Sequence, residues 1–215
     1  MRSKQMGSAN ADGRRARGAR TRDAVLAEAV QLASVEGLEG LSIAHLAARL
    51  GTAKSSVHAP FGSKEALQVA VVAHTRDILI ELVIAPALET PAGLQRLSAL
   101  GEGWMSYLER KTFEGGCVLS SASLEMDGRP GPARDAVAAV MREWLDLLED
   151  NVVRGVEEGE IMADTDPAHL AFALNAVGMA ANWQSQLFGE TFSYDTGRTG
   201  WAQLLAQHQA PASHQ

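Results

Sequence analysis

The chain has 215 residues, of which 46% are hydrophobic, and its single cysteine, Cys117, excludes an internal disulfide framework and a zinc site built on several cysteines. No run of about 18 consecutive apolar residues occurs, so we expect no transmembrane helix and a cytoplasmic protein. The net charge of −7 is unevenly divided, because residues 1–76 hold 11 Lys+Arg against 6 Asp+Glu, whereas residues 77–215 hold 8 against 20.

The basic excess lies largely in a polar N-terminal segment. Residues 1–18 show no apolar period, and we predict that they form a disordered basic tail. Arg14, Arg15 and Arg17 either reach into a DNA minor groove or only keep the tail solvated, and the sequence leaves both uses open. A basic N-terminal third on an acidic protein indicates one face that binds a polyanion, although the tail alone accounts for much of the excess of basic residues.

The first two helices are defined by their caps. Thr21 is a predicted N-cap for a helix that ends at Gly37, because glycine suits the left-handed position after a helix. Ser42 caps a short second helix, whose apolar residues recur at helical spacing. Gly51 ends this helix.

A third and a fourth helix follow directly. Thr52 is the predicted cap of the third helix, which runs to about Ala59 and stops at Pro60, since proline lacks an N–H group. Ser63 caps a longer fourth helix that runs to about Ala85.

The rest of the chain keeps a helical apolar period, and no strand-like alternation exceeds a few residues. The sequence therefore predicts an all-α protein. The further predicted helices cover residues 91–111, 118–126, 133–158, 167–187 and 199–207.

The second and third helices form the pattern of a helix-turn-helix, in which the second of two short helices lies in the major groove of DNA. Small polar side chains and one cation on that helix suit base and phosphate contact, although a solvated helix face would show the same residues. Ser42 and Lys64 begin flanking helices, whose N-termini favour phosphate. The predicted DNA-binding residues are Ser42, Thr52, Lys54, Ser55, Ser56, His58 and Lys64.

Residues 21–67, in particular the runs 41–47 and 51–67 with their Phe-Gly-Ser-Lys-Glu-Ala-Leu ending, resemble the DNA-binding domain of TetR/AcrR-type repressors. The segment 115–134 is similar to the C-terminal domain of one branch of that family. The resemblance implies about nine helices in two domains, dimerisation through the last two long helices, and release from DNA by a ligand. The implied organisation is a tail at 1–18, a helix-turn-helix domain at 19–66, a ligand-binding and dimerisation domain at 67–208, and a tail at 209–215.

Two positions depart from the family pattern. The family usually has an aromatic residue, commonly tyrosine, where this chain has His58, and a histidine, tyrosine or other polar residue where it has Pro60. Histidine still donates to phosphate, more strongly when protonated, but proline cannot donate. We therefore expect somewhat weaker or more pH-sensitive DNA binding.

Aromatic, methionine and amide side chains in the C-terminal part are candidates for a ligand pocket, since such pockets are apolar with a few polar groups. At helical spacing each such side chain is more often a core residue than a ligand contact. Cys117 is either a redox or electrophile sensor or an inert buried thiol. The candidate pocket residues are Trp104, Tyr107, Met141, Trp144, Asn175, Met179 and Trp183.

The helix at 167–187 is rich in small side chains, which permit close approach of another helix. That helix belongs either to a second subunit or to the same chain. The small residues are Ala168, Ala171, Ala173, Ala176, Gly178, Ala180 and Ala181.

The hypothesis that accounts for most of these features is a homodimeric repressor that binds a palindromic operator in double-stranded DNA and is released by a small molecule. A DNA-binding protein without a ligand is one alternative. An all-helical enzyme is another, but the sequence offers no nucleophile–base pair, carboxylate pair or metal-ligand spacing, so we predict no catalytic residue, metal or cofactor.

Overall fold

A computed structural model describes residues 3–189 and 192–211, with side chains from residue 18 onward. The described part is all-helical and contains no strand, only an isolated bridge between Ile161 and Gln209. The helices are α1 (Ser3–Gly40), α2 (Ile43–Arg49), α3 (Lys54–His58), α4 (Lys64–Leu79), the π-helix η1 (Ile80–Ile84), α5 (Ala85–Leu88), α6 (Leu94–Glu109), α7 (Val118–Met126), α8 (Pro132–Glu157), α9 (Pro167–Phe188) and α10 (Phe192–His208). With α4, η1 and α5 counted as one continuous helix, the described residues form nine helices, as expected.

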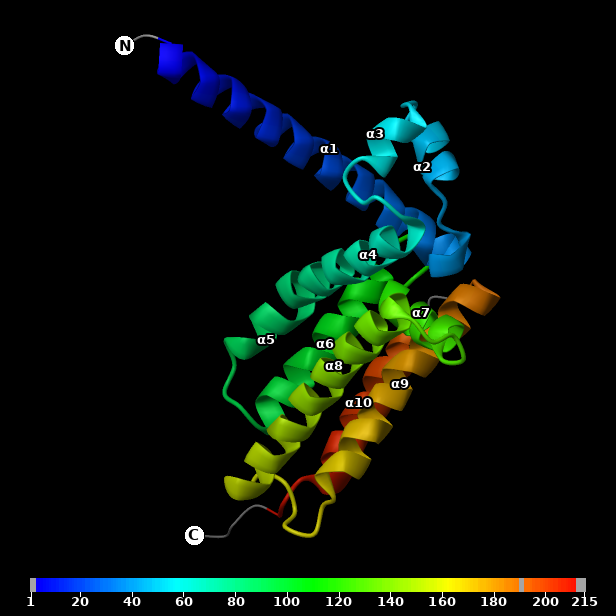
Figure 1. Cartoon of the computed structure of the whole chain (residues 1–215). Helices are drawn as coiled ribbons and strands as arrows, with labels where there is room; N and C mark the ends of the chain where they lie inside the picture. Colours follow the sequence, from blue (N-terminus) through cyan, green and yellow to red (C-terminus); the bar gives the residue numbers. More distant parts are fainter. Residues whose placement is uncertain (1–2, 190–191, 212–215) are drawn as a thin grey trace.

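The N-terminal domain is formed by α1, α2 and α3, which lie together at the N-terminal end of α4 (Figure 1). Its core joins Ala29 of α1, Leu46 of α2 and Val57 of α3, all of which are fully buried. Because each of these helices is short or half-exposed, their mutual burial stabilises the domain more than intrinsic helix propensity does.

The two serine caps are confirmed. Ser42 Oγ accepts the N–H of His45 at 3.1 Å, and Ser63 Oγ accepts the N–H of Ala66 at 3.0 Å. The turn between α2 and α3 depends on Gly51, whose φ of +59° is a conformation that side chains with a Cβ rarely adopt.

Two other predicted caps are wrong. Ala53, not Thr52, is the N-cap of α3, and no side chain caps that helix. Thr21 lies inside α1, because α1 begins at Ser3 and continues through the segment that we expected to be a disordered tail. Alanine and arginine, which are frequent there, have high intrinsic helix propensity. The side chains of Arg14, Arg15 and Arg17 lie outside the described residues.

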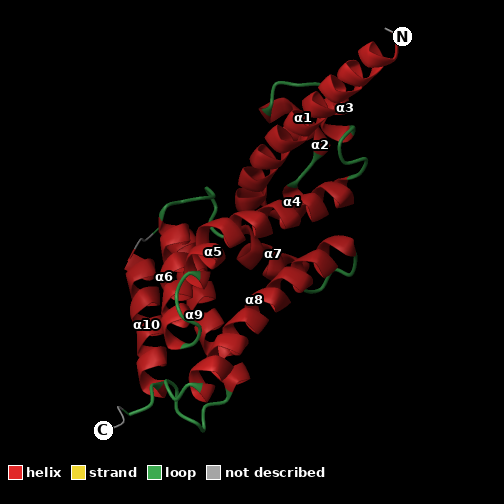
Figure 2. Ribbon diagram, turned by 90° about the vertical axis from the view of Figure 1, so that its left-hand side faces the viewer, coloured by secondary structure: helices red, strands yellow, loops and turns green. Residues whose placement is uncertain are grey.

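The helix formed by α4, η1 and α5 joins the two domains (Figure 2). It continues past the predicted end at Ala85 and includes Pro86. The π-turn explains this difference, because the Ala85 N–H donates to Ile80 rather than to residue 81, and Pro86 then occupies the first turn of α5, where its missing N–H costs little.

The C-terminal domain is a bundle of α6, α8, α9 and α10, with the short α7 between the bundle and α1 (Figures 1 and 2). The last helix begins earlier than the predicted residue 199. Its first turns carry Gly197 and the buried Tyr194, and Gly197 packs against Met105 and Ala181, where only a small residue fits. No helix in the described ranges combines the length and the apolar character needed to cross a membrane.

Hydrogen bonds tie the end of α1 to the C-terminal domain. Glu125 of α7 accepts the N–H groups of Leu38, at 2.8 Å, and Glu39, at 3.0 Å, just after the non-helical Gly37. The Gln31 amide donates to the Thr112 carbonyl at 3.0 Å and accepts from the Glu114 N–H at 3.1 Å. The orientation of the N-terminal domain is therefore fixed by α7 and by the segment before it.

Candidate nucleic-acid interface and ligand cavity

The helix α3 presents its polar side chains to solvent. Val57 is fully buried and fastens α3 to the domain core. The predicted contact residues Thr52, Lys54, Ser55 and His58 are exposed, and Ser56 is half-buried. The outward face of α3 thus combines hydroxyl groups, one cation and one imidazole, which are groups that donate to bases and phosphates.

Ser42 and Lys64 begin the helices on either side of α3. Ser42 is exposed and caps α2, whereas Lys64 Nζ donates to the Glu39 carbonyl at 2.6 Å and lies 3.1 Å from Glu39 Oε2. The Lys64 ammonium and the Gln68 amide lower the pKa of the Glu39 carboxyl. Lys64 therefore links α4 to the end of α1 in this structure, a contact that periodicity does not reveal.

Pro60 is half-buried in the turn after α3. In this turn the His58 carbonyl accepts the N–H groups of Phe61, at 3.1 Å, and Gly62, at 2.7 Å. The Arg22 guanidinium lies 5.4 Å from the centre of the Phe61 ring, a cation–π distance that holds α1 against this turn. Arg22 is a further exposed cation near α3, and only the tertiary structure places it there.

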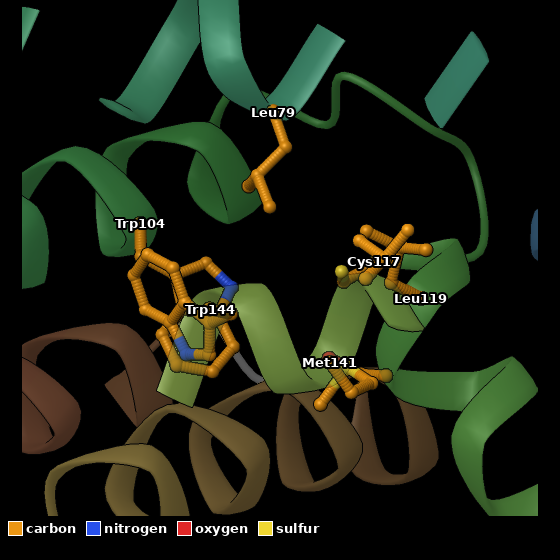
Figure 3. Close-up of a pocket in the computed structure, with 8 residues that line it drawn as sticks. Leu79, Trp104, Cys117, Leu119, Met141 and Trp144 are labelled. Atoms are coloured by element: carbon orange, nitrogen blue, oxygen red, sulfur yellow. The ribbon is translucent and has the colours of Figure 1, made fainter. Parts of the chain in front are cut away.

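The C-terminal domain contains an apolar cavity between α4, α6, α7 and α8. In Figure 3, Trp104 and Trp144 lie on one side, Cys117 and Leu119 lie across from them, and Leu79 and Met141 are above and below. The cavity has a volume of about 20 Å³, which is room for about one water molecule. The lining residues are Leu79, Trp104, Cys117, Leu119, Ser120, Val140, Met141 and Trp144.

Three predicted pocket residues, Trp104, Met141 and Trp144, are brought together in this cavity. The Trp104 and Trp144 rings pack edge to face with centroids 5.1 Å apart. Asn175 does not line the cavity, but its Oδ1 accepts Trp144 Nε1–H at 3.2 Å, so this amide has the partner that a polar residue on an apolar helix needs.

The other three predicted pocket residues lie elsewhere. Tyr107 lines a separate hollow beside η1 and α5, where burial and then the neighbouring Cys117 thiol raise its pKa. Met179 and Trp183 line a hollow between α7 and α9, where Trp183 is exposed and Met179 is half-buried against the core. Asn182, beside them, accepts the Cys117 N–H at 3.0 Å.

Five lining residues were missed by the sequence analysis. Leu79 ends α4 and Val140 precedes Met141 in α8, and both follow an ordinary core pattern. Cys117, Leu119 and Ser120 come from the start of α7. Only the packing of α7 across the bundle brings these side chains to one cavity, so no local signal could have found them. The thiol of Cys117 is free and buried.

Two family models match the chain in sequence. The model described as "Bacterial regulatory proteins, tetR family" matches residues 25–71, and the model described as "Tetracyclin repressor-like, C-terminal domain" matches residues 93–201, just over half of the chain. No curated protein matches the chain.

Solved structures share the whole fold. A TetR transcriptional regulator from Chloroflexus aurantiacus is 27% identical with a TM-score of 0.82, and the match covers 91% of this chain and 99% of that protein. A TetR-family regulator from Agrobacterium tumefaciens is 21% identical with a TM-score of 0.79, covering 90% and 100%. AibR, solved with isovaleryl coenzyme A and operator DNA, is 19% identical with a TM-score of 0.69, covering 89% and 99%.

Proposed function

The chain belongs to the TetR family of transcriptional regulators, and from that premise we propose that it is a homodimeric repressor, which binds a palindromic operator through α3 and dissociates when a small molecule binds its C-terminal domain. The observation that carries the proposal is the division of α3 into a buried Val57 and an exposed polar face, inside the segment 25–71 that the tetR-family model of bacterial regulatory proteins matches. A chromosomal target implies a cytoplasmic protein.

DNA contact is assigned to the exposed face of α3 and to the helix starts beside it. Lys54 and His58 supply donors for bases or phosphates, whereas Ser55 and Thr52 are small enough to let the helix backbone lie deep in the groove. Lys64 reaches a phosphate only by leaving Glu39, so we assign it a weaker contribution than Lys54.

A homodimer is supported by the exposed apolar side chains of α9 and of the start of α10. Soluble monomers rarely expose such residues together, and in a symmetric dimer each copy would cover the same surface of its partner. Some small residues of α9 pack within the chain and others are left for a second subunit. Ala171, Gly178 and Ala181 are buried within the chain, whereas Ala168 and Ala176 are exposed. The exposed apolar residues are Phe172, Trp183, Leu187, Phe188 and Phe192.

A ligand can release DNA only if a change at the cavity is transmitted to α3. Leu79 of α4 and Leu119 of α7 line the cavity, and both helices are joined to α1, through Lys64 and Glu125 respectively. A ligand that favours a different placement of these helices would change the separation of the two α3 helices from the ~34–36 Å of one DNA turn. AibR, with operator DNA and isovaleryl coenzyme A in its structure, supports the idea that this fold accommodates both.

The test begins with selection of bound sequences from random DNA, followed by affinity measurements on the selected operator. We expect Lys54→Ala to weaken binding by about tenfold, because a good base contact contributes ~1–3 kcal/mol. Lys111→Ala, which removes an exposed cation from the C-terminal domain, is the matched control and should bind as the wild type does. Unchanged operator affinity in both Lys54→Ala and His58→Ala would refute the assignment of α3.

A further inference from the structure

The Glu39 carboxylate is shared by two cations that come from different domains. Lys64 Nζ, at the start of α4, lies 3.1 Å from Glu39 Oε2, and a guanidinium nitrogen of Arg129 lies 3.7 Å from the same oxygen. The other oxygen, Oε1, accepts the Gln68 amide at 3.2 Å. Among the described residues, neither cation has a second carboxylate within ion-pair distance. Both cations therefore depend on Glu39 for their ion pair.

The backbone of Glu39 is held in place, whereas its carboxylate is exposed. Glu125 of α7 accepts the Glu39 N–H, and the buried Gln68 of α4 donates to the preceding carbonyl, that of Leu38, at 2.8 Å. The side chains of Glu39, Lys64 and Arg129 are all exposed. The acceptor is thus fixed between the domains, and the two cations reach it on long side chains that are free to leave.

The position of Arg129 is set by the C-terminal domain. Arg129 belongs to the turn at residues 127–131, which joins α7 to α8. A Cβ added at Gly131 would lie 3.4 Å from Glu65 Oε1, so this turn lies against the first turn of α4. Both α7 and α8 contribute to the wall of the apolar cavity. A rearrangement of either helix would move the turn and change the distance between Arg129 and Glu39.

The Lys64 ammonium is wanted by two anions once DNA is present. We assign Lys64 to operator phosphate, and a phosphate oxygen is a charged acceptor like the Glu39 carboxylate. The Glu39 carbonyl, which accepts Lys64 Nζ at 2.6 Å, is neutral and is a weaker competitor. An approach of Arg129 to Oε2 offsets the charge of the carboxylate and weakens its hold on Lys64, and a withdrawal of Arg129 strengthens that hold.

We propose that Glu39 limits the contact between Lys64 and operator phosphate, and that Arg129 of the C-terminal domain relieves this limit by pairing with the same carboxylate. The inference rests on the proposed function, because it concerns affinity for the operator. Glu39 and Arg129 are positioning residues that act through Lys64 and do not themselves touch DNA. They give the C-terminal domain a route to change DNA affinity without any movement of α3.

The first test is a double-mutant cycle on operator affinity, measured with the full chain. Glu39→Gln removes the charge but keeps an oxygen that accepts the Gln68 amide, so binding should tighten by about twofold to fivefold, the range for one exposed ion pair. Arg129→Gln should weaken binding by a similar factor, because Glu39 then holds Lys64 alone. In the Lys64→Met background both effects should disappear.

Two control variants separate this competition from the general effect of charge near DNA. Glu36→Gln removes an exposed carboxylate from the same end of α1, and Arg134→Gln removes an exposed cation from the start of α8. Among the described residues, neither forms an ion pair with Glu39 or Lys64. Each control should have the same effect with and without Lys64, whereas the effects of Glu39→Gln and Arg129→Gln should depend on it.

A measurement without DNA tests the shared contact itself. The Lys64 ammonium, then the Gln68 amide and last the Arg129 guanidinium, lower the pKa of the Glu39 carboxyl. In an NMR titration, the pKa of Glu39 should therefore rise in Lys64→Met and rise by less in Arg129→Gln. An unchanged pKa in both variants would refute the shared contact.

Three affinity results would overturn the inference: unchanged binding in Glu39→Gln, a gain that persists in the Lys64→Met background, or binding by Arg129→Gln that is as tight as wild type. Operator binding that shows any of these results refutes the competition and leaves the proposed function standing. Failure to select any operator would instead refute the proposed function. The cycle is then run on an unrelated duplex, because phosphate contacts do not depend on sequence, and the NMR titration needs no DNA.

Discussion

Replacement of Glu125 by alanine should loosen the attachment of the N-terminal domain. The Glu125 carboxylate accepts two backbone N–H groups, from Leu38 at 2.8 Å and from Glu39 at 3.0 Å. A hydrogen bond to a charged group contributes ~1.5–3 kcal/mol when buried. One of these bonds is partly buried and the other is exposed, so solvent screening reduces the expected loss to about 2 kcal/mol in all.

A loss of that size should lower the melting temperature by about 4–8 °C in a chain of this length, compared at equal protein concentration because the proposed dimer makes melting concentration-dependent. Hydrogen exchange should also accelerate at the amides of Leu38 and Glu39, which lose their acceptor. Glu125→Gln retains one acceptor oxygen, so its melting temperature should lie between those of the wild type and Glu125→Ala. Glu114→Ala removes an exposed carboxylate from the same region and should melt as the wild type does. A melting temperature within about 1 °C of wild type, with unchanged exchange at both amides, would refute the assigned role.

Three further predictions follow from the packing and charges. Gly178→Ala should destabilise the fold by ~1–3 kcal/mol in urea titrations, because the new Cβ would lie 2.0 Å from Trp104 Cζ3, whereas Gly18→Ala, with open space around it, should be neutral or stabilising. The lowered pKa of Glu39 means that its contribution to stability is present above the ordinary value of 4.5 and is lost as pH falls through the folded pKa. Lys64→Met should therefore melt below wild type at neutral pH, and the difference should narrow in acid to what the bond from Lys64 Nζ to the Glu39 carbonyl contributes. The logarithm of operator affinity should fall linearly with the logarithm of salt concentration, with a slope of about −0.9 per phosphate contacted. A flat response would contradict DNA binding through α3 and its flanking cations.

Local features of the N-terminal domain were predictable because their causes lie within a few residues. Ser42 and Ser63 cap helices by bonds to N–H groups three residues ahead, and Gly51 supplies the backbone angle of one turn. The exposed polar face of α3 was predictable for the same reason, because the helical period places Val57 inward and the polar residues around it outward. Thr21 was wrong as a cap because the chain before it is already helical, from Ser3 onward. Thr52 was wrong because α3 has its N-cap one residue later, at Ala53.

The ends of long helices depended on tertiary packing. The π-turn carries the helix through Pro86, and contacts with Met105 and Ala181 stabilise the first turns of α10 around Gly197. Neither effect has a signature in the local sequence. A proline and a glycine ordinarily end a helix, and here the packing of other elements outweighs that tendency.

The sequence by itself determined the helical class, the family and the polar face of α3, because these rest on short-range periodicity, capping and an ordered run of residues. Only the tertiary structure decided which side chains line the cavity and which carboxylate holds α1. Trp104, Cys117 and Val140 come from three different helices or their caps, and Glu125 lies 87 residues from the amide of Leu38 that it binds. Hydrogen bonds within a helix are set by neighbours in sequence, whereas a cavity wall is set by the way in which whole helices pack.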